Sequence, residues 1–302
     1  MEREELVRQI NRLKRDRDAI VLAHNYQLPE IQEIADYLGD SLDLARKVVS
    51  IRQKVVVFCG VIFMAESAKV LNPEKTILIP VQKASCGLAN KITADQIRQL
   101  KMHHPEAAVV GYINTYAEVK GECDICCTSA NAAEIVNSMP AGEIIFLPDR
   151  NLANYAELKS NRKLLKWPGY CYVHHRLIRR PQALALIKKH PGAVVLAHPE
   201  CTPEVLSLAD HVLGTGGMIR LVRESKQNEF IILTEVGLID RMRREFPAKT
   251  FFRVEEAVCD AMKLTTLESV YESLLDMKYE IELAAEVAHG ARRALEKMLE
   301  RA

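Results

Sequence analysis

Ile20-Val21-Leu22-Ala23-His24-Asn25-Tyr26 is a short apolar run that ends in polar residues, and the pattern occurs twice more in the chain. Residues 108–114 and 194–200 repeat it, with steps of 88 and 86 positions between corresponding residues. Fully apolar runs of this length are typical of strands buried in parallel sheets. The repetition therefore predicts three copies of one α/β unit.

Three further sets of landmarks follow nearly the same steps. They are the polar helix starts Ser41, Ser129 and Thr215, the apolar runs at residues 55–59, 144–148 and 230–234, and the cysteines Cys86, Cys171 and Cys259. Each unit is therefore expected to contain a strand, helix, short strand, helix, strand, helix, strand and then a cysteine. We expect an α/β fold of three homologous three-layer α/β/α modules with small parallel sheets, at residues 19–105, 106–191 and 192–264.

The three modules are expected to surround one central active-site cavity. Ligands of open parallel sheets bind outside the carboxyl ends of the strands, and these are the ends that carry the polar residues and the cysteines. A pseudo-three-fold axis would let all three sets of strand ends face the same cavity. Three tandem modules with separate sites are the alternative arrangement.

The two ends of the chain are expected to be helical and to have packing roles. Residues 1–18 carry apolar side chains at helical spacing among charges, as a surface helix does. Residues 265–302 are expected to form a helical tail that braces the third module against the other two.

The charge balance gives no strong global field. The 302 residues include 41 lysines and arginines and 40 aspartates and glutamates, so nothing favours nucleic acid or an anionic membrane as a partner. The charged N-terminal stretch does not fit a signal peptide, and no apolar run approaches the roughly 18 to 20 residues that span a bilayer. We therefore expect a cytoplasmic protein, whose eight cysteines are metal ligands, reactive thiols or core residues rather than disulfides.

One cysteine per module points to a shared metal centre. If Cys86, Cys171 and Cys259 converge, their thiolates can hold zinc with an open fourth position, or a [4Fe–4S] cluster with one free iron. Their spacing is no metal motif by itself, so burial in the core is the competing interpretation. The more conspicuous Cys123-Asp124-Ile125-Cys126-Cys127 resembles half a zinc site or a redox pair, but it has no second half and is expected in the core.

Hydroxyl residues open a helix at the same place in each module. Ser41, Ser129 and Thr215 can each add a donor to the free backbone N–H groups of a helix start, which attract anions. Each alone fits an ordinary N-cap. Three of them around one cavity predict a substrate with more than one anionic group.

Side chains that donate and accept protons are expected on the rim of the cavity, because they follow the strand ends. His24-Asn25-Tyr26 and His198-Pro199-Glu200 occupy the same place in two modules. His174, three residues after Cys171, is expected to face the same cavity, and His175 to face away. The residues of the rim are His24, Tyr26, Tyr112, Asn114, His198 and Glu200.

Several motifs then occur in a characteristic order. They are Ala23-His24-Asn25-Tyr26-Gln27, Gly39-Asp40-Ser41-Leu42, Phe58-Cys59-Gly60-Val61-Ile62-Phe63-Met64-Ala65-Glu66, Tyr112-Ile113-Asn114-Thr115, Asp124-Ile125-Cys126-Cys127-Thr128-Ser129, Ala197-His198-Pro199-Glu200-Cys201 and Thr234-Glu235-Val236-Gly237. With this set, the chain closely resembles quinolinate synthase, the A protein of de novo NAD biosynthesis, over nearly its whole length. One segment departs from the family: Gly214-Thr215-Gly216-Gly217-Met218 stands where Gly-Ser-Thr-Ser-Gly-Met is common.

The resemblance implies a cofactor and a reaction. The cofactor is a [4Fe–4S] cluster held by Cys86, Cys171 and Cys259, whose fourth iron is open and acts as a Lewis acid. The reaction is the condensation of iminoaspartate with dihydroxyacetone phosphate to quinolinate, with loss of phosphate and two waters, which makes the enzyme a transferase that also dehydrates. The family is linked functionally to L-aspartate oxidase, the source of iminoaspartate.

The resemblance also implies roles for individual side chains. Tyr26 and Glu200 would form the acid/base pair for the carbon-bond and dehydration steps. The catalytic residues implied are Tyr26, Glu200, His198 and His24. The substrate-binding residues implied are Ser41, Met64, Tyr112, Asn114, Ser129, His174 and Thr215.

Two alternatives use the same residues differently. A zinc or iron–sulfur lyase or hydratase of another dicarboxylate would keep the three cysteines as ligands. A non-catalytic protein that binds a phosphorylated metabolite would have them in its core.

Overall fold

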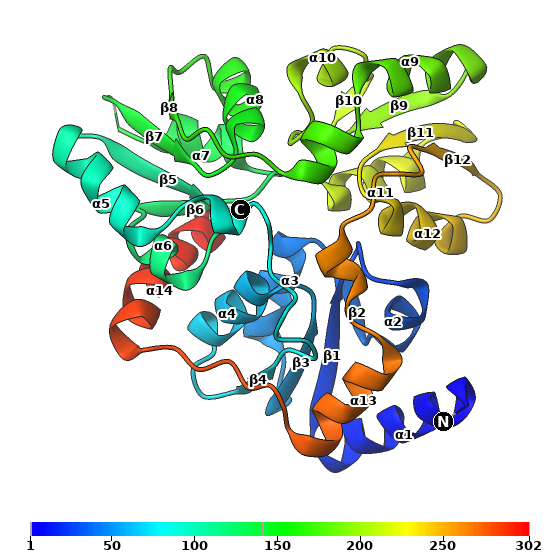
Figure 1. Ribbon diagram of the computed structural model, residues 1–302. Coiled ribbons are helices and arrows are strands. Elements are labelled where there is room, and N and C mark those ends of the chain that lie inside the picture. Colours follow the sequence, from blue (N-terminus) through cyan, green and yellow to red (C-terminus); the bar gives the residue numbers. More distant parts are fainter. Residues whose placement is uncertain (1, 141, 302) are drawn as a thin grey trace.

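Three small sheets, each of four parallel strands, form the framework of the protein (Figure 1). The computed structural model describes residues 2–140 and 142–301. In every sheet the first strand of the module lies beside the short second strand and the third strand, and the fourth strand lies at the edge. The orders are β2-β1-β3-β4, β6-β5-β7-β8 and β10-β9-β11-β12. The predicted α/β fold of three α/β/α modules is confirmed.

The same order of elements occurs in each module. The first contains β1 (Ala19–His24), α2 (Pro29–Ile34), β2 (Tyr37–Gly39), α3 (Ser41–Ser50), β3 (Val55–Cys59), α4 (Ile62–Leu71) and β4 (Thr76–Leu78). The second contains β5 (Ala108–Tyr112), α6 (Ala117–Gly121), β6 (Ile125–Cys127), α7 (Ala132–Ser138), β7 (Ile144–Leu147), α8 (Arg150–Ser160) and β8 (Leu165–Lys166). The third contains β9 (Val194–Ala197), α10 (Pro203–Leu206), β10 (His211–Val212), α11 (Thr215–Glu224), β11 (Glu229–Leu233), α12 (Val236–Glu245) and β12 (Thr250–Arg253).

Short helical turns follow the last strand of each module. They are η1 (Ala89–Lys91), η2 (Val173–Leu177) and η3 (Asp260–Lys263). Two helices, α5 (Ala94–His103) and α9 (Arg180–Lys189), then lead into the next module. The central strands β1, β3 and β7 are buried along their whole length, because helices cover both faces of each sheet.

An aspartate fastens the short second strand of each sheet to the first strand. The Asp36 carboxylate accepts a hydrogen bond from the backbone N–H of Val21 at 2.8 Å, and the Asp36 N–H donates to the Val21 carbonyl at 2.9 Å. Asp124 does the same with Val109, and Asp210 with Val195. The carboxylate replaces a ladder acceptor where the short strand begins.

The three modules are arranged around a common centre (Figure 1). The first lies at the bottom of this view, the second at the upper left and the third at the upper right. Polar contacts join them near the centre: Tyr112 of the second module donates to Glu200 of the third, and Tyr26 of the first bonds Thr234 of the third. The carboxyl ends of the strands therefore meet, as the repeat predicted.

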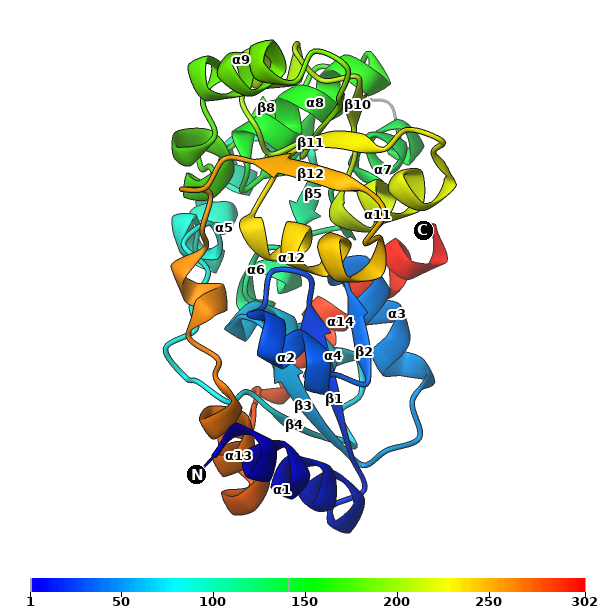
Figure 2. The same cartoon turned by 90° about the vertical axis from the view of Figure 1, so that its right-hand side faces the viewer.

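The tail packs differently from the prediction. It is helical, as expected, and consists of α13 (Leu267–Asp276) and α14 (Ala285–Glu300). Helix α13 packs on β3 and on α1 (Arg3–Asp16), at the foot of the first module (Figure 2). Helix α14 packs on α4, α6 and β6, with Gly290 against Gly121. The tail therefore braces the first and second modules, and the expected role at the third was wrong. No helix in the described ranges is long and apolar enough to cross a membrane.

We predict that Asp124→Ala lowers the free energy of unfolding by about 1 to 3 kcal/mol, because the buried Val109 N–H loses its acceptor. Asp124→Asn is the control, since its amide oxygen can accept the same hydrogen bond. Urea unfolding of both variants gives the comparison. Equal losses in the two would show that the hydrogen bond to Val109 contributes nothing.

Candidate active site

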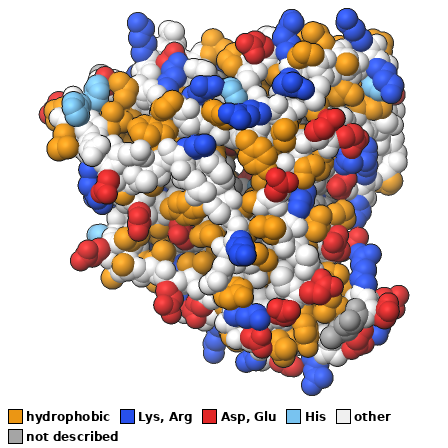
Figure 3. Space-filling model, viewed as in Figure 1, with side chains coloured by type: hydrophobic (Ala, Val, Ile, Leu, Met, Phe, Trp, Pro, Cys, Tyr) orange, Lys and Arg blue, Asp and Glu red, His pale blue; other side chains and the backbone are white. Residues whose placement is uncertain are grey.

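One cavity lies between the three modules, and the face shown in Figure 3 has a narrow hollow near its middle. Every residue that the sequence predicted for the site lines this cavity, except Thr215. The lining residues among them are His24, Tyr26, Ser41, Met64, Cys86, Tyr112, Asn114, Ser129, Cys171, His174, His198, Glu200 and Cys259. The prediction missed the remaining lining residues, which are Asp40, Leu42, Val61, Phe63, Thr128, Val173 and Met262.

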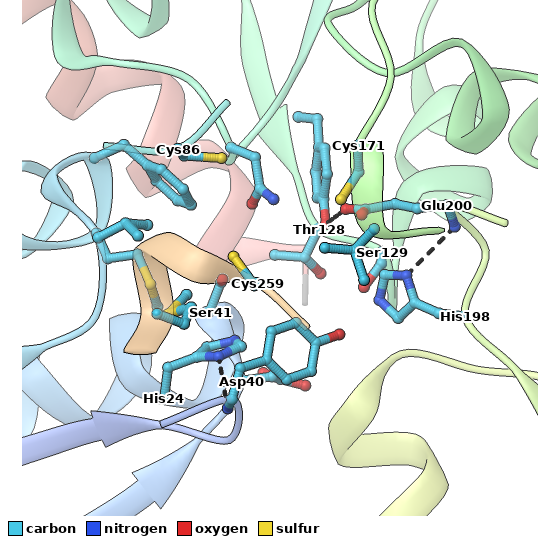
Figure 4. Close-up of a pocket in the computed structure, with 18 of the residues that line it drawn as sticks. His24, Asp40, Ser41, Cys86, Thr128, Ser129, Cys171, His198, Glu200 and Cys259 are labelled. Carbon is cyan, nitrogen blue, oxygen red and sulfur yellow. Dashed lines mark hydrogen bonds between the residues drawn. The ribbon is translucent and has the colours of Figure 1, made fainter. Parts of the chain in front are cut away.

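Three cysteines, one from each module, line the same cavity (Figure 4). Cys86, Cys171 and Cys259 each follow the last strand of their sheet. Burial raises the pKa of all three thiols, to about 12 for Cys86 and about 11 for Cys259. The nearby Cys259 raises the pKa of Cys86 further. Cys86 and Cys259 both raise the pKa of Cys171. A cationic centre between them would reverse this effect and favour the thiolates.

The backbone amide three positions later opposes that shift and lowers the pKa of each of these thiols. The residues are Ala89 for Cys86, His174 for Cys171 and Met262 for Cys259. An N–H group near the sulfur favours the charged thiolate. The local structure after each cysteine therefore suits a sulfur that ligates a metal.

The other cysteines differ from these three. Cys59, Cys123, Cys126, Cys127 and Cys201 are buried and do not line the cavity. The Cys123 thiol donates to the carbonyl of Val119 at 3.2 Å, inside its own module. The cysteine-rich motif therefore lies in the core, as expected.

The spacing of the three cavity sulfurs bears on the choice of metal. In the described ranges, the three potential ligands whose donor atoms lie within 4.8 Å of one another are Cys171, His174 and Glu200, a set that could hold a single ion. The cysteine trio does not meet this limit, whereas sulfurs bound to one tetrahedral zinc ion lie about 3.8 Å apart. In this structure the three sulfurs are therefore not placed as ligands of one zinc ion.

A chain of hydrogen bonds links two tyrosines through the cavity wall. The Tyr112 hydroxyl donates to Glu200 Oε1 at 2.6 Å, and His174 Nδ1 lies 2.7 Å from Glu200 Oε2. His174 Nε2 is 2.9 Å from the Thr234 hydroxyl, which is 2.7 Å from the Tyr26 hydroxyl. Thr234 belongs to a family motif, but its role in this chain of hydrogen bonds was not predicted, because the sequence does not show which side chains lie beside it.

The buried titratable groups have opposite tendencies. Burial opposes ionisation of Glu200, but its interactions with His174, His198 and Tyr112 outweigh burial and lower the pKa of the carboxyl. Burial, with Glu200 nearby, raises the pKa of Tyr26 and Tyr112 well above the ordinary value. At neutral pH the cavity therefore holds a carboxylate beside two protonated phenols.

Two histidines occupy equivalent positions and are fixed in the same way. His24 Nδ1 accepts from the backbone N–H of Tyr26 at 3.2 Å, and His198 Nδ1 accepts from that of Glu200 at 3.3 Å. Burial is the main cause that lowers the pKa of each to about 3, so both rings are neutral at neutral pH. His175 faces away from the cavity, where it bonds Arg150 and Asn151.

The expected helix starts differ from one another. Ser41 and Thr215 are the first residues of α3 and α11, but the expectation was wrong for Ser129, which lies in a turn three positions before α7 begins at Ala132. Ser41 and Ser129 line the cavity, but the Thr215 hydroxyl accepts a hydrogen bond from Asn25 at 2.9 Å and lies outside it. Asp40 Oδ2 accepts from the Gly216 N–H at 3.1 Å and so occupies the start of α11. Asn114 Oδ1 is buried at the cavity without a hydrogen-bond partner, which makes it available to a ligand.

Known proteins resemble this chain over its full length. Residues 8–300 match the family model described as quinolinate synthetase A protein. A quinolinate synthase of Thermococcus kodakarensis is 48% identical over 99% of both chains, and one of Thermococcus onnurineus is 49% identical over the same shares. A quinolinate synthase of Pyrococcus horikoshii is 46% identical over 98% of this chain and 99% of its own.

The low pKa of His198 predicts a loss of stability in acid. The unfolded chain binds a proton near pH 6.5 that the folded ring takes up only at about pH 3, so stability falls as the pH drops through this window. Between pH 7 and pH 5 this histidine costs about 2 kcal/mol. Urea unfolding of the metal-free protein and of metal-free His198→Gln at pH 7 and pH 5 measures this loss of unfolding free energy. An equal pH dependence of the two proteins would contradict a buried neutral His198.

Proposed function

The chain belongs to the quinolinate synthetase A protein family, and we propose that it condenses iminoaspartate with dihydroxyacetone phosphate. The products are quinolinate, one phosphate and two molecules of water, and quinolinate serves NAD biosynthesis. The observation that carries the proposal is that one cavity gathers a cysteine from each module beside Glu200 and two tyrosines. A binding protein with core cysteines would not need this arrangement.

Cys86, Cys171 and Cys259 are the residues that would hold a [4Fe–4S] cluster. Their sulfurs line one cavity, do not all lie within 4.8 Å of one another, and each has its pKa lowered by the backbone amide three positions later. When bound, a cluster with one iron free of protein ligands supplies a Lewis acid that polarises an oxygen of the substrate.

Neutral donors would bind the anionic groups of the substrates. His24 and His198 carry no charge at neutral pH, so the carboxylates and the phosphate must be held by hydrogen bonds. Ser41 and Ser129 supply hydroxyls on the cavity wall. Thr215 can join them only if the cavity enlarges toward α11, because it now lies behind the wall. The free oxygen of Asn114 can accept from a substrate N–H or O–H.

Glu200 and Tyr26 would form the acid/base pair. Forming the carbon–carbon bond requires removal of a proton from the carbon that attacks, and Glu200, which is ionised at neutral pH, is the carboxylate beside Tyr112 that can accept it. The two dehydrations require a proton for each departing hydroxyl. Protonated Tyr26 can donate this proton. It can recover one through Thr234, which bonds Tyr26, and then His174, which bonds Thr234. Tyr112 and the two neutral histidines orient the substrate.

We predict that the protein, purified and reconstituted anaerobically, forms quinolinate from dihydroxyacetone phosphate when L-aspartate oxidase supplies iminoaspartate. Quinolinate is measured by chromatography, with omission of each substrate as the control. A preparation that contains iron and sulfide in full but forms no quinolinate would refute the proposal. Stoichiometric zinc in place of iron and sulfide would favour the zinc lyase.

We predict that Glu200→Gln keeps its iron and sulfide and loses turnover by about 100-fold or more, because the amide cannot act as a base. Glu157→Gln on α8 is the matched control, since Glu157 pairs with Lys166 at 2.9 Å outside the cavity. Iron content and steady-state rate are measured on both variants. A Glu200→Gln enzyme with full turnover would remove this residue from the acid/base role.

A further inference from the structure

Two buried carboxylates outside the cavity bind directly to the backbone of the cysteines. Asp149 Oδ2 accepts a hydrogen bond from the backbone N–H of Cys171 at 3.0 Å. Glu235 Oε1 accepts one from the backbone N–H of Cys259, also at 3.0 Å. Both side chains belong to residues without solvent exposure. Neither is a cavity residue, and neither takes part in the proposed reaction.

The second oxygen of each carboxylate holds the start of a helix. Asp149 Oδ1 accepts from the N–H groups of Asn151 and Leu152, both at 2.8 Å, at the first turn of α8. Glu235 Oε2 accepts from the N–H of Gly237 at 2.7 Å, at the first turn of α12. An N-cap needs only one oxygen. The other oxygen therefore links the helix to the cysteine, which lies on a different segment of the chain.

The two residues occupy equivalent places in their modules. Each lies two positions after the third strand, β7 or β11. The equivalent residue of the first module is Val61, and the steps from Val61 to Asp149 to Glu235 are 88 and 86 positions, those of the main repeat. Valine has no acceptor in its side chain. The carboxylate link thus exists for Cys171 and Cys259. Val61 cannot provide one for Cys86.

We infer that Asp149 and Glu235 are positioning residues for the metal centre, which hold Cys171 and Cys259 in the orientation that ligation requires. The inference rests on the proposed function, because it takes the three cysteines as ligands. A group that fixes a ligand from outside typically changes metal affinity by about 10- to 100-fold when it is altered. The first module has no such residue at Val61.

The isosteric amides separate this role from capping. In Asp149→Asn one oxygen can still cap α8, but the NH₂ group then faces the Cys171 N–H, and two donors cannot bond each other. In Glu235→Gln the same conflict arises at Cys259, where Lys263 Nζ is a further donor at 2.9 Å. The opposite amide orientation moves the conflict to the cap. Shape and burial are unchanged in both variants.

Asp124→Asn and Asp210→Asn are the matched controls. Each replaces a carboxylate by an amide in the same module as the variant it controls. Asp124 accepts a hydrogen bond from the backbone N–H of Val109, and Asp210 accepts one from that of Val195. Neither residue lines the cavity or contacts a cysteine ligand. Each of these N–H groups needs a single acceptor, and the amide oxygen of asparagine can provide it.

The experiment measures iron release from the reconstituted holoenzyme into excess ferrous chelator under anaerobic conditions. We expect release to be about 10- to 100-fold faster in Asp149→Asn and in Glu235→Gln than in the unaltered protein. The control variants should release iron at a rate within about two-fold of that of the unaltered protein. Circular dichroism of each metal-free protein tests whether it folds. If Asp149→Asn fails to fold, Glu235→Gln decides.

Folded variants that release iron at the unaltered rate would overturn the inference. Loss of folding in both, while the controls fold, would also overturn it, because the carboxylates would then be needed for the fold itself. Failure of the proposed function is distinguishable. An unaltered protein that never binds iron and sulfide refutes the cluster, whereas one that binds them but forms no quinolinate refutes the reaction and leaves the positioning result valid.

Discussion

The direction of the parallel strands is the constraint on which the site depends. Every strand of a parallel sheet delivers its carboxyl end to the same edge, so a module of four strands presents its loops together. Three such modules around one centre bring residues nearly 240 positions apart, such as His24 and Cys259, to one cavity. The sheets are small, and an aspartate in each secures the short second strand, after which Ser41 and Ser129 reach the cavity in the first two modules.

The cavity achieves its polarity with little formal charge. Burial keeps His24 and His198 neutral and both tyrosines protonated, while Glu200 remains ionised only because His174, His198 and Tyr112 surround it. A site of this kind binds anions through hydroxyl and amide groups whose positions are fixed before the substrate arrives. Such preorganised dipoles need little rearrangement when charge develops during the reaction.

Much of this arrangement could be predicted from the sequence, because the strands are apolar runs with a long regular repeat. The repeat, together with the family resemblance, placed Cys86 and all but one of the other predicted site residues in a common cavity. Thr215 was the exception, since no pattern reveals that Asn25 and Asp40 occupy its surroundings. The link from Asp149 and Glu235 to the cysteines was missed although both lie at one repeated position, because the sequence does not show which distant backbone groups a carboxylate bonds. The tail was misplaced for a related reason: an amphipathic helix shows which face it buries, but not against which module.

Three similar modules must become different to serve an asymmetric reaction. At one repeated position the chain has His24, Tyr112 and His198, and at another it has Val61, Asp149 and Glu235. The third module supplies both Glu200 and Thr234, so the proton-bearing groups of the other two modules, Tyr112 and Tyr26, each bond to it. The cysteines keep equivalent places in the three modules, while the residues beside them have diverged. Under the proposed function, this arrangement lets a repeated fold hold one metal centre with equivalent ligands and still distinguish two substrates.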